Sequence, residues 1–229
     1  MIHIPKTIHY VWLGGKPMPP LMCQWRVKWG TLHPGWKINV WSEAPGHIEL
    51  LTCKWEMFAS QYPRQLRKCC HLSQRSNIWR YELIERFGGL YLDADFEPIK
   101  NIEDLIDSKE AFAGKSTVNY PEGSKIEAAC SLIGSTPHHP WTRDLVEHVK
   151  TRDPAMSRSL GFSYFHEITS RHPEVVLFEP DVFYSQRWEQ PGHYKPIPPK
   201  SAYAVHRWSS KWFPEGFRML ATEAAPKKR

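Results

Sequence analysis

Two aspartates, Asp93 and Asp95, directly follow the short apolar run of residues 90–92, which is typical of a buried strand. Side chains two apart on an extended segment point the same way, so both carboxylates could reach one point just past the strand. Two carboxylates at one point repel unless a cation or a shared proton lies between them, and Mg²⁺ or Mn²⁺ suits carboxylate oxygen. We therefore predict a metal at the carboxyl edge of a sheet, where open α/β sheets bind ligands.

A helix and a pair of glycines come before these aspartates. Apolar residues recur at helical spacing over residues 74–87, and Ser73 is the predicted N-cap. Gly88 and Gly89 then end the helical pattern, because glycine takes the left-handed conformation at little cost. The predicted order is helix, tight stop, buried strand and carboxylates.

The first forty residues alternate between strand and helix patterns. Residues 7–13 and 36–41 are rich in β-branched and aromatic side chains, and residues 21–32 carry apolar side chains at helical spacing. This alternation predicts an α/β fold with a mostly parallel central sheet and helices on both faces.

The later elements are shorter and less regular. We predict mixed helical structure over residues 47–72 with Pro63 as a break, strands at 111–114, 128–135, 175–178, 182–184 and 203–208, and helices at 102–106, 140–150 and 164–170. The chain shows no internal repeat or linker, so we expect one domain over residues 1–222 and a disordered basic tail at 223–229.

Composition narrows the possible partners and location. The 229 residues carry a net charge of +6 and eleven tryptophans, which suits an anionic ligand or surface and aromatic stacking on bases or sugars. A basic surface that is simply solvated explains the charge equally well. No apolar stretch is long enough to span a membrane, no signal-peptide layout is present, and the five cysteines form no C-x-x-C pair. We expect a cytoplasmic protein, compatible with peripheral contact at the inner face of a membrane.

Four stretches in order carry a family resemblance. They are residues 4–14 (IPKTIHYVWLG), 76–81 (SNIWRY), 88–95 (GGLYLDAD) and 206–212 (HRWSSKW). Together they resemble glycosyltransferase family 32, the DXD sugar-binding group with a GT-A fold, and more distantly the large clostridial glucosylating toxins. The resemblance implies transfer of a sugar from a nucleotide-sugar donor with retention of the anomeric configuration, and it is thin between residues 101 and 202.

The resemblance also implies how a metal would be held. Asp95 would be the direct ligand of Mn²⁺ or Mg²⁺, and Asp93 would contact the sugar or ribose or reach the metal through water. His206 and Ser210 would complete the metal and diphosphate site. From the residues alone, a hydrogen-bonded histidine at a strand end is an equally good interpretation of His206.

A second set of residues is implied to bind the donor, with a UDP-sugar favoured and GDP-mannose as the alternative. Trp12 would stack on the base, although a core position is an equal interpretation from the residues alone. Arg80 would lie near the phosphate–sugar junction, where its planar fork suits phosphate oxygen, although a solvated helix arginine is the ordinary reading. Tyr91 and Ser76 would line the same pocket, and Trp212 would close over it.

Three positions depart from the family pattern. Asn77 occupies the place of an aspartate that accepts hydrogen bonds from the sugar; with Asp93 and Arg80 it makes up the predicted catalytic group. Asparagine carries no charge, so a transferase that binds nucleotide but turns over poorly is an alternative. Cys130 stands where family members often have asparagine, and Lys211 interrupts the usual Gly-Ser-Trp. The acceptor is expected to be a saccharide, a lipid-linked saccharide or another hydroxyl compound.

Two other functions are compatible with parts of the sequence. A haloacid-dehalogenase-like phosphatase also places D-x-D after an apolar strand, but near the start of the chain, with the first aspartate as nucleophile. A basic aromatic nucleic-acid-binding module would show salt-dependent, metal-independent affinity for polymer. No known nucleic-acid motif supports that module, so we expect no nucleic-acid partner.

Overall fold

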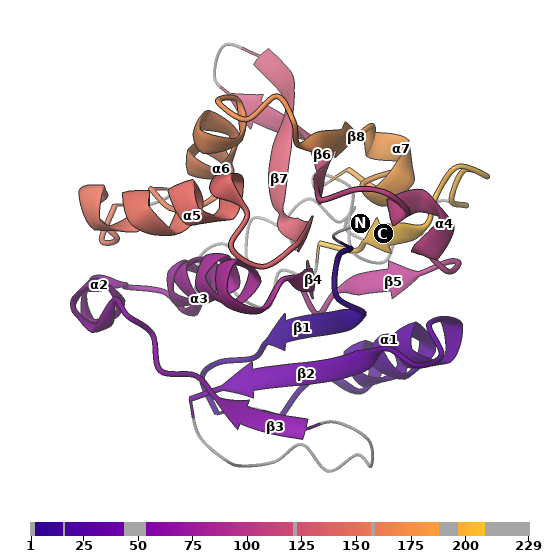
Figure 1. The fold of residues 1–229 in the computed structure, drawn as a ribbon, viewed down its shortest axis with the longest axis horizontal. Helices are drawn as coiled ribbons and strands as arrows, with labels where there is room; N and C mark the ends of the chain where they lie inside the picture. The colour runs from indigo at the N-terminus through magenta and orange to yellow at the C-terminus, as the bar shows by residue number, and fades with distance from the viewer. Residues whose placement is uncertain are drawn as a thin grey trace, which may run out of the picture.

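The computed structural model describes residues 3–15, 17–43, 54–120, 123–156, 159–187 and 197–208, and it contains a seven-stranded sheet (Figure 1). The strand order is β3-β2-β1-β4-β7-β6-β8. The strands are β1 (Thr7–Val11), β2 (Lys37–Ser42), β3 (Lys54–Met57), β4 (Gly89–Leu92), β6 (Ala111–Tyr120), β7 (Gly123–Ser135) and β8 (Val176–Phe178). Strands β3, β2, β1 and β4 are parallel neighbours, β7 runs antiparallel to β4 and β6, and β8 is parallel to β6. The predicted mostly parallel α/β sheet is confirmed.

Helices cover both faces of this sheet, as predicted. One face carries α3 (Leu72–Phe87), α5 (Pro140–Glu147), η1 (His148–Thr151) and α6 (Phe162–Thr169). The other face carries α1 (Pro20–Leu32), α4 (Glu103–Ile106) and α7 (Pro180–Phe183). Strand β1 serves both layers: Ile8 and Tyr10 pack toward α1, and Val11 packs toward α3. Because side chains alternate along a strand, its nearly continuous apolar sequence is what a two-sided burial requires.

Helix α3 has a defined start and stop. Its Gln74 side chain accepts hydrogen bonds from the backbone N–H groups of Cys70 and His71, at 2.8 and 2.9 Å. The helix therefore begins at Leu72 with His71 as N-cap, and the predicted Ser73 cap is wrong by two residues. It ends at Gly88, whose φ of 62° and closeness to the Pro137 ring both exclude a side chain.

His9 ties the first strands to this helix stop. Its Nε2 donates to the carbonyl oxygen of Gly88 at 3.1 Å, and its Nδ1 accepts from Trp41 Nε1 at 3.0 Å. These two bonds require the neutral tautomer with the proton on Nε2. Burial lowers the pKa of His9 to about 4, against a smaller raising effect of the Gly88 carbonyl. The ring therefore stays neutral at physiological pH and connects β1, β2 and the beginning of β4.

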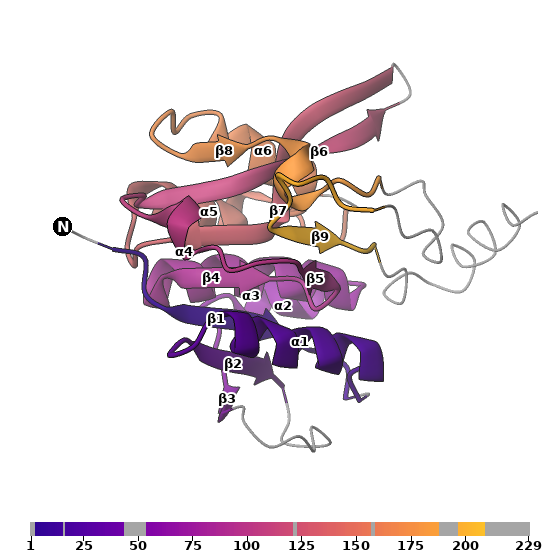
Figure 2. The same ribbon diagram turned by 90° about the vertical axis from the view of Figure 1, so that its right-hand side faces the viewer.

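A second, two-stranded sheet brings the last described strand beside the aspartates. Strand β5 (Phe96–Pro98) pairs antiparallel with β9 (Ala204–His206), with Phe96 opposite His206. Trp29 of α1 donates from Nε1 to the Phe96 carbonyl oxygen at 3.1 Å, which anchors the pair to the helix beneath it. Figure 2 shows β5 and β9 next to each other.

Several element predictions need correction. Residues 54–57, predicted as part of a mixed helical stretch, form strand β3, and Pro63 begins helix α2 (Pro63–Lys68) rather than breaking a helix. Residues 182–184, predicted as a strand, lie at the end of α7 and just beyond it. That helix starts with Pro180 and Asp181, which are favourable first-turn residues.

Strands β6 and β7 are longer than predicted, because they pair with each other in a hairpin whose end projects beyond the sheet (Figure 2). In the described part of the chain, no helix is long and apolar enough to cross a membrane. The predicted tail at residues 223–229 lies outside the described residues.

Candidate active site

Asp93 and Asp95 lie in a turn rather than on an extended segment. The Phe96 N–H donates to the Asp93 carbonyl oxygen at 3.2 Å, which closes the turn. The Asp93 N–H donates to the Ser131 carbonyl oxygen at 2.9 Å, so the ladder between β4 and β7 continues to the turn. The predicted alternation along a strand is therefore the wrong reason for the convergence of the two carboxylates; the turn brings them together.

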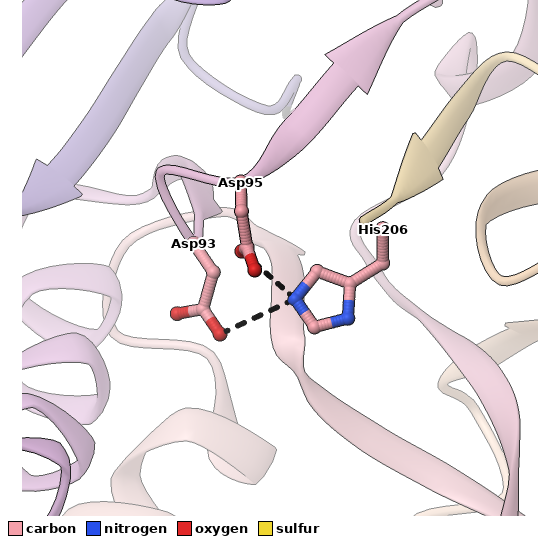
Figure 3. A group of neighbouring side chains, drawn as sticks. All are labelled: Asp93, Asp95 and His206. Atoms are coloured by element: carbon pink, nitrogen blue, oxygen red, sulfur yellow. Dashed lines mark ion pairs between the residues drawn. The ribbon is translucent and has the colours of Figure 1, made fainter. Parts of the chain in front are cut away.

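Both carboxylates converge on His206 of β9 (Figure 3). His206 Nε2 lies 3.0 Å from Asp95 Oδ1 and 3.8 Å from Asp93 Oδ2. One ligand atom from each of the three residues lies within 4.8 Å of the others. The side chains of His206 and Asp95 are 5% and 6% exposed, whereas that of Asp93 is 24% exposed. Two oxygens and one imidazole nitrogen thus face one point with restricted access to water.

The bonding state of His206 fits a metal ligand. Although Asp95 Oδ1 is close, neither ring nitrogen makes a hydrogen bond of normal geometry within the described residues. Leaving a buried polar group unpaired costs about 1–3 kcal/mol. A divalent cation such as Mn²⁺ accepts carboxylate and imidazole ligands together, so this donor set fits the predicted metal. We refer to Asp93, Asp95 and His206 as the metal triad.

Ring packing and the backbone hold His206 in place. Phe96 stacks on the imidazole with 4.6 Å between centroids, and Trp208 meets it edge-on at 4.1 Å. The Arg207 N–H donates to the Asp95 carbonyl oxygen at 2.9 Å. The ring orientation is therefore set by the β5–β9 pair and its aromatic neighbours.

Arg80 and Tyr91 hold the other end of the triad. Asp93 Oδ1 accepts from the Tyr91 hydroxyl at 2.6 Å and lies 3.1 Å from Arg80 Nη2. Both contacts fall on the same carboxylate oxygen, so Oδ2 is directed toward His206. This arrangement orients Asp93 before any ligand arrives.

The guanidinium of Arg80 is itself enclosed. It donates from Nη1 to the Cys130 carbonyl oxygen at 2.8 Å and from Nη2 to Ser76 Oγ at 3.2 Å, and it lies 4.6 Å from the Tyr91 ring centroid. Burial alone would lower the pKa of Arg80, but the charge of Asp93 outweighs it and the pKa is raised. The structure therefore places this permanent charge against Asp93. The predicted contact with donor phosphate stays a prediction.

The other predicted donor residues lie around this pair. Ser76 is buried one turn before Arg80 on α3, and the neighbouring Asn77 is half-buried. Trp12, at the end of β1, is 8% exposed and packs in the core on the α1 side. Their roles in binding the donor remain predictions. Ser210 and Trp212 lie outside the described residues.

Sequence reasoning missed Tyr184, Gln186 and the role of Trp208. Tyr184 packs edge-on against His206 with 5.6 Å between ring centroids, and Trp208 donates from Nε1 to the Gln186 carbonyl oxygen at 2.7 Å. Trp208 lies in the stretch of residues 206–212 that carries the family resemblance, so its place near the site could have been predicted. Tyr184 and Gln186 had no such signal, because about ninety residues separate them from the aspartates in the sequence.

A second concavity lies away from the triad. A cavity of about 300 Å³ is lined by Ser108, Lys109, Glu110, Ala111, His139, Glu174 and Val176. It borders Ala111, the first residue of β6, whereas the triad follows the last residue of β4. Strands β4 and β6 run in the same direction, because both are antiparallel to β7. The cavity at the start of β6 and the triad after β4 therefore lie at opposite ends of the strands. The chemistry of the triad therefore does not involve this cavity.

Comparison with known families identifies the motif region. The profile of the family described as "Glycosyltransferase sugar-binding region containing DXD motif" matches residues 21–112. Residues 21–112 of the chain are therefore similar to this sugar-binding region. The matched range includes α3, β4 and both aspartates, and the triad is completed by His206 from beyond it.

Curated relatives match the chain at low identity. The chain is 24% identical over 153 residues to a mannosyl phosphorylinositol ceramide synthase of Saccharomyces cerevisiae, covering 66% of this chain and 36% of the yeast protein. It is 25% identical over 142 residues to an uncharacterized glycosyltransferase of Acanthamoeba polyphaga mimivirus, covering 60% and 52%. The chain thus matches about a third to a half of the length of these relatives.

Solved glycosyltransferase structures share the fold. The PaToxG glycosyltransferase aligns with a TM-score of 0.56 at 16% identity, covering 74% of this chain and 70% of that one. The galactosyltransferase LgtC, solved with donor and acceptor sugar analogues, aligns with a TM-score of 0.53 at 13% identity, covering 95% of both chains. The architecture of this chain is therefore GT-A-like.

Proposed function

We propose that this protein is a metal-dependent glycosyltransferase that moves a sugar from a nucleotide-sugar donor to an acceptor hydroxyl. The observation that carries the proposal is the triad of Asp93, Asp95 and His206 just past the carboxyl end of β4, with a buried imidazole that lacks a hydrogen bond among the described residues. The DXD family match over residues 21–112 and the GT-A-like fold support it.

In this proposal, Asp95 and His206 hold a divalent cation, and Asp93 joins them directly or through water. The bound cation would stabilise the negative charge that collects on the diphosphate when the sugar–phosphate bond breaks. Arg80 and Tyr91 keep Asp93 in one orientation, which removes a reorganisation cost from the reaction. Burial of the triad keeps water away from these charges and strengthens their interaction.

The finer assignments are also proposals. We propose that the sugar keeps its anomeric configuration through front-face attack by the acceptor hydroxyl, without a carboxylate nucleophile. In this segment, Asp93 and Asp95 face the metal position and Glu97 is paired with Arg207. A UDP-sugar is the favoured donor. The yeast relative is named as a mannosyl phosphorylinositol ceramide synthase, which supports keeping GDP-mannose and a lipid-linked acceptor as alternatives. A single domain over residues 1–222 and a cytoplasmic location, compatible with peripheral contact at the inner face of a membrane, belong to the same proposal.

The test is donor hydrolysis across UDP-glucose, UDP-galactose, UDP-N-acetylglucosamine and GDP-mannose, with Mn²⁺ or with EDTA. We expect one donor to be hydrolysed only with metal, and the activity to be lost in Asp95→Asn. Asp107→Asn is the matched control, because Asp107 is an exposed aspartate outside the site. A wild-type protein with neither turnover nor metal-dependent nucleotide binding would overturn the proposal.

Asn77 separates an active enzyme from one that only binds nucleotide. If wild type binds nucleotide with metal but does not hydrolyse any donor in the panel, Asn77→Asp is the decisive variant. Restored hydrolysis would assign the loss to the missing carboxylate. If Asn77→Asp also fails to hydrolyse any donor, and the donor is consumed only when a saccharide acceptor is added, the lack of hydrolysis reflects a strict acceptor requirement.

A further inference from the structure

Unpaired polar atoms gather on the segment that follows α7. Tyr184 Oη, Ser185 Oγ and Gln186 Nε2 are all shielded from water and make no hydrogen bond within the described residues. The ring nitrogens of His206 share this property, and the Tyr184 ring lies against His206. Buried polar groups are normally paired, so such a concentration beside a metal triad indicates a place prepared for a ligand.

The Tyr184 ring packs beside His206 because Gly114, at an irregularity of the sheet, has no side chain to block it. The register of β6 and β7 shifts between Ala113 and Gly114, and a side-chain carbon on Gly114 would lie 2.6 Å from Tyr184 Cε2. The ring then packs edge-on against Phe96, with 5.5 Å between centroids. Tyr184 as a whole is 3% exposed.

The hydroxyl of Tyr184 is kept protonated. A tyrosine hydroxyl is a hydrogen-bond donor at neutral pH, because a phenol ordinarily ionises only near pH 10. Ser131 is a polar neighbour of this hydroxyl, although the two do not meet the geometry of a hydrogen bond. Tyr184 therefore presents a neutral O–H donor on the Asp93 side of the triad.

Gln186 presents a second donor whose orientation is determined. Arg207 Nη1 donates to Gln186 Oε1 at 2.8 Å, and Arg207 is held in turn by Glu97. A guanidinium can only donate, so the amide atom that faces it must be the oxygen. The Gln186 NH₂ group is therefore left without an acceptor among the described residues, in a residue that is 0% exposed.

Trp208 adds an aromatic surface to the two donors. Its indole lies 6.0 Å from the Tyr184 ring, centroid to centroid, and its Nε1 donates to the Gln186 carbonyl oxygen. Trp208, Asp93 and Ser185 are partly exposed, so solvent reaches the group at these residues. Hydrogen-bond donors next to an aromatic face match a pyranose ring, which offers hydroxyl oxygens at its edge and C–H groups on its faces.

We propose that Tyr184 and Gln186, with the indole of Trp208, form a subsite that binds the hydroxyl groups of a hexopyranosyl unit beside the metal triad. Tyr184 Oη and Gln186 Nε2 donate hydrogen bonds to sugar oxygens. The inference rests on the proposed function and deepens it, because it assigns sugar recognition to a segment outside the DXD region. The sugar is that of the donor or that of the acceptor, and the experiment separates the two.

The test uses two variants that each remove one donor. Tyr184→Phe deletes the hydroxyl and keeps the ring, and Gln186→Glu keeps the oxygen that Arg207 contacts while replacing the NH₂ group. Tyr203→Phe is the matched control, because the Tyr203 hydroxyl bonds the exposed Asp104 away from the triad. With Mn²⁺ present, calorimetry measures the binding of UDP, GDP, UDP-glucose, UDP-galactose and GDP-mannose, and kinetics measures donor hydrolysis and transfer to a saccharide acceptor.

We expect both variants to bind the nucleoside diphosphate within about twofold of wild type, since it carries no sugar. A donor-sugar subsite predicts that affinity for the sugar nucleotide falls about 3- to 10-fold, the usual effect of one lost hydrogen bond. An acceptor-sugar subsite predicts unchanged donor hydrolysis and an acceptor KM raised by the same factor. Either result supports the subsite and identifies its sugar.

Different failures have different meanings. Variants that match Tyr203→Phe in every sugar-dependent constant, while nucleotide binding is normal, overturn the subsite and leave the proposed function standing. A wild-type protein that binds no nucleoside diphosphate overturns the proposed function and the subsite with it. If Tyr184→Phe fails to fold, as thermal melting would show, Gln186→Glu decides the question alone.

Discussion

The two sides of the metal triad differ in how completely their polar groups are paired. On the α3–β4 side, Asp93 Oδ1 is bonded to Tyr91 and lies beside Arg80, whose guanidinium also bonds Ser76 and the Cys130 carbonyl. On the β9 side, the ring nitrogens of His206, the Tyr184 hydroxyl and the Gln186 NH₂ group make no hydrogen bond among the described residues, although Asp95 Oδ1 lies 3.0 Å from His206 Nε2.

This difference teaches which part the protein completes by itself. On the α3–β4 side, the polar groups around Asp93 are paired with one another once the protein folds, so these residues should contribute strongly to stability. On the β9 side, the unbonded polar atoms obtain partners only when ligands bind, so these residues should matter more for binding than for folding. The following predictions test that division.

The largest effect is expected from Arg80→Met. Removing one partner of a buried ion pair leaves Asp93 uncompensated, and such losses cost about 3–5 kcal/mol of unfolding free energy. Urea unfolding at pH 7 measures it, with Arg143→Met as the matched control, because Arg143 is an exposed helix arginine. Equal stability of the two variants would contradict a preassembled α3–β4 side.

Metal binding should stabilise the protein through His206 on the β9 side. At a Mn²⁺ concentration one hundred times its dissociation constant, we expect wild type to gain about 2.7 kcal/mol. His206→Gln should lose most of this gain while its stability with EDTA stays within about 1 kcal/mol of wild type. Thermal melting with and without Mn²⁺ measures both. A His206 variant as strongly stabilised as wild type would remove His206 from the metal site.

Acid should weaken the link between β1 and α3 through His9. The pKa of His9 is lowered to about 4 in the folded protein from an ordinary value of 6.5, so folding favours the neutral ring. The stability it contributes is present above pH 6.5 and is lost as the pH falls through about 4, on the order of 3 kcal/mol in all. Urea unfolding from pH 8 to pH 4 should show this loss in wild type, and His9→Gln should be flatter across the same window.

Glu82 is an exception on α3, as are Arg75 and Trp79, because its Oε2 is buried without a hydrogen bond among the described residues. Burial raises the pKa of Glu82 to about 7, against the hydrogen bonds from Ser60 and Gln61 that lower it. A raised carboxyl pKa gives stability that is present below pH 4.5 and lost as the pH rises through 7. Glu82→Gln should therefore stabilise the protein by about 1–2 kcal/mol at pH 8 and by little at pH 5. The exposed Glu147→Gln should show no such difference.

Local patterns predicted the helix–glycine–strand order correctly and for the right reason. Gly88 has positive φ, and a side chain there would clash with Pro137, so the prediction of a glycine-dependent helix stop is confirmed. The strand at residues 182–184 was wrong, because a short apolar run does not distinguish a strand from a helix turn, and Pro180 decided for the helix.

The sequence by itself determined the α/β sheet, the glycine stop and the two aspartates, because these depend on residues close together in the chain. The family resemblance named His206 as a metal ligand, and the tertiary structure places it with both aspartates. Only the tertiary structure decided that Arg80 neutralises Asp93 and that Tyr184 and Gln186 lie beside the triad. The physical reason is that these contacts depend on burial and on the pairing of β5 with β9, which joins segments far apart in the chain. Local periodicity contains no information about which distant strand will supply the third ligand.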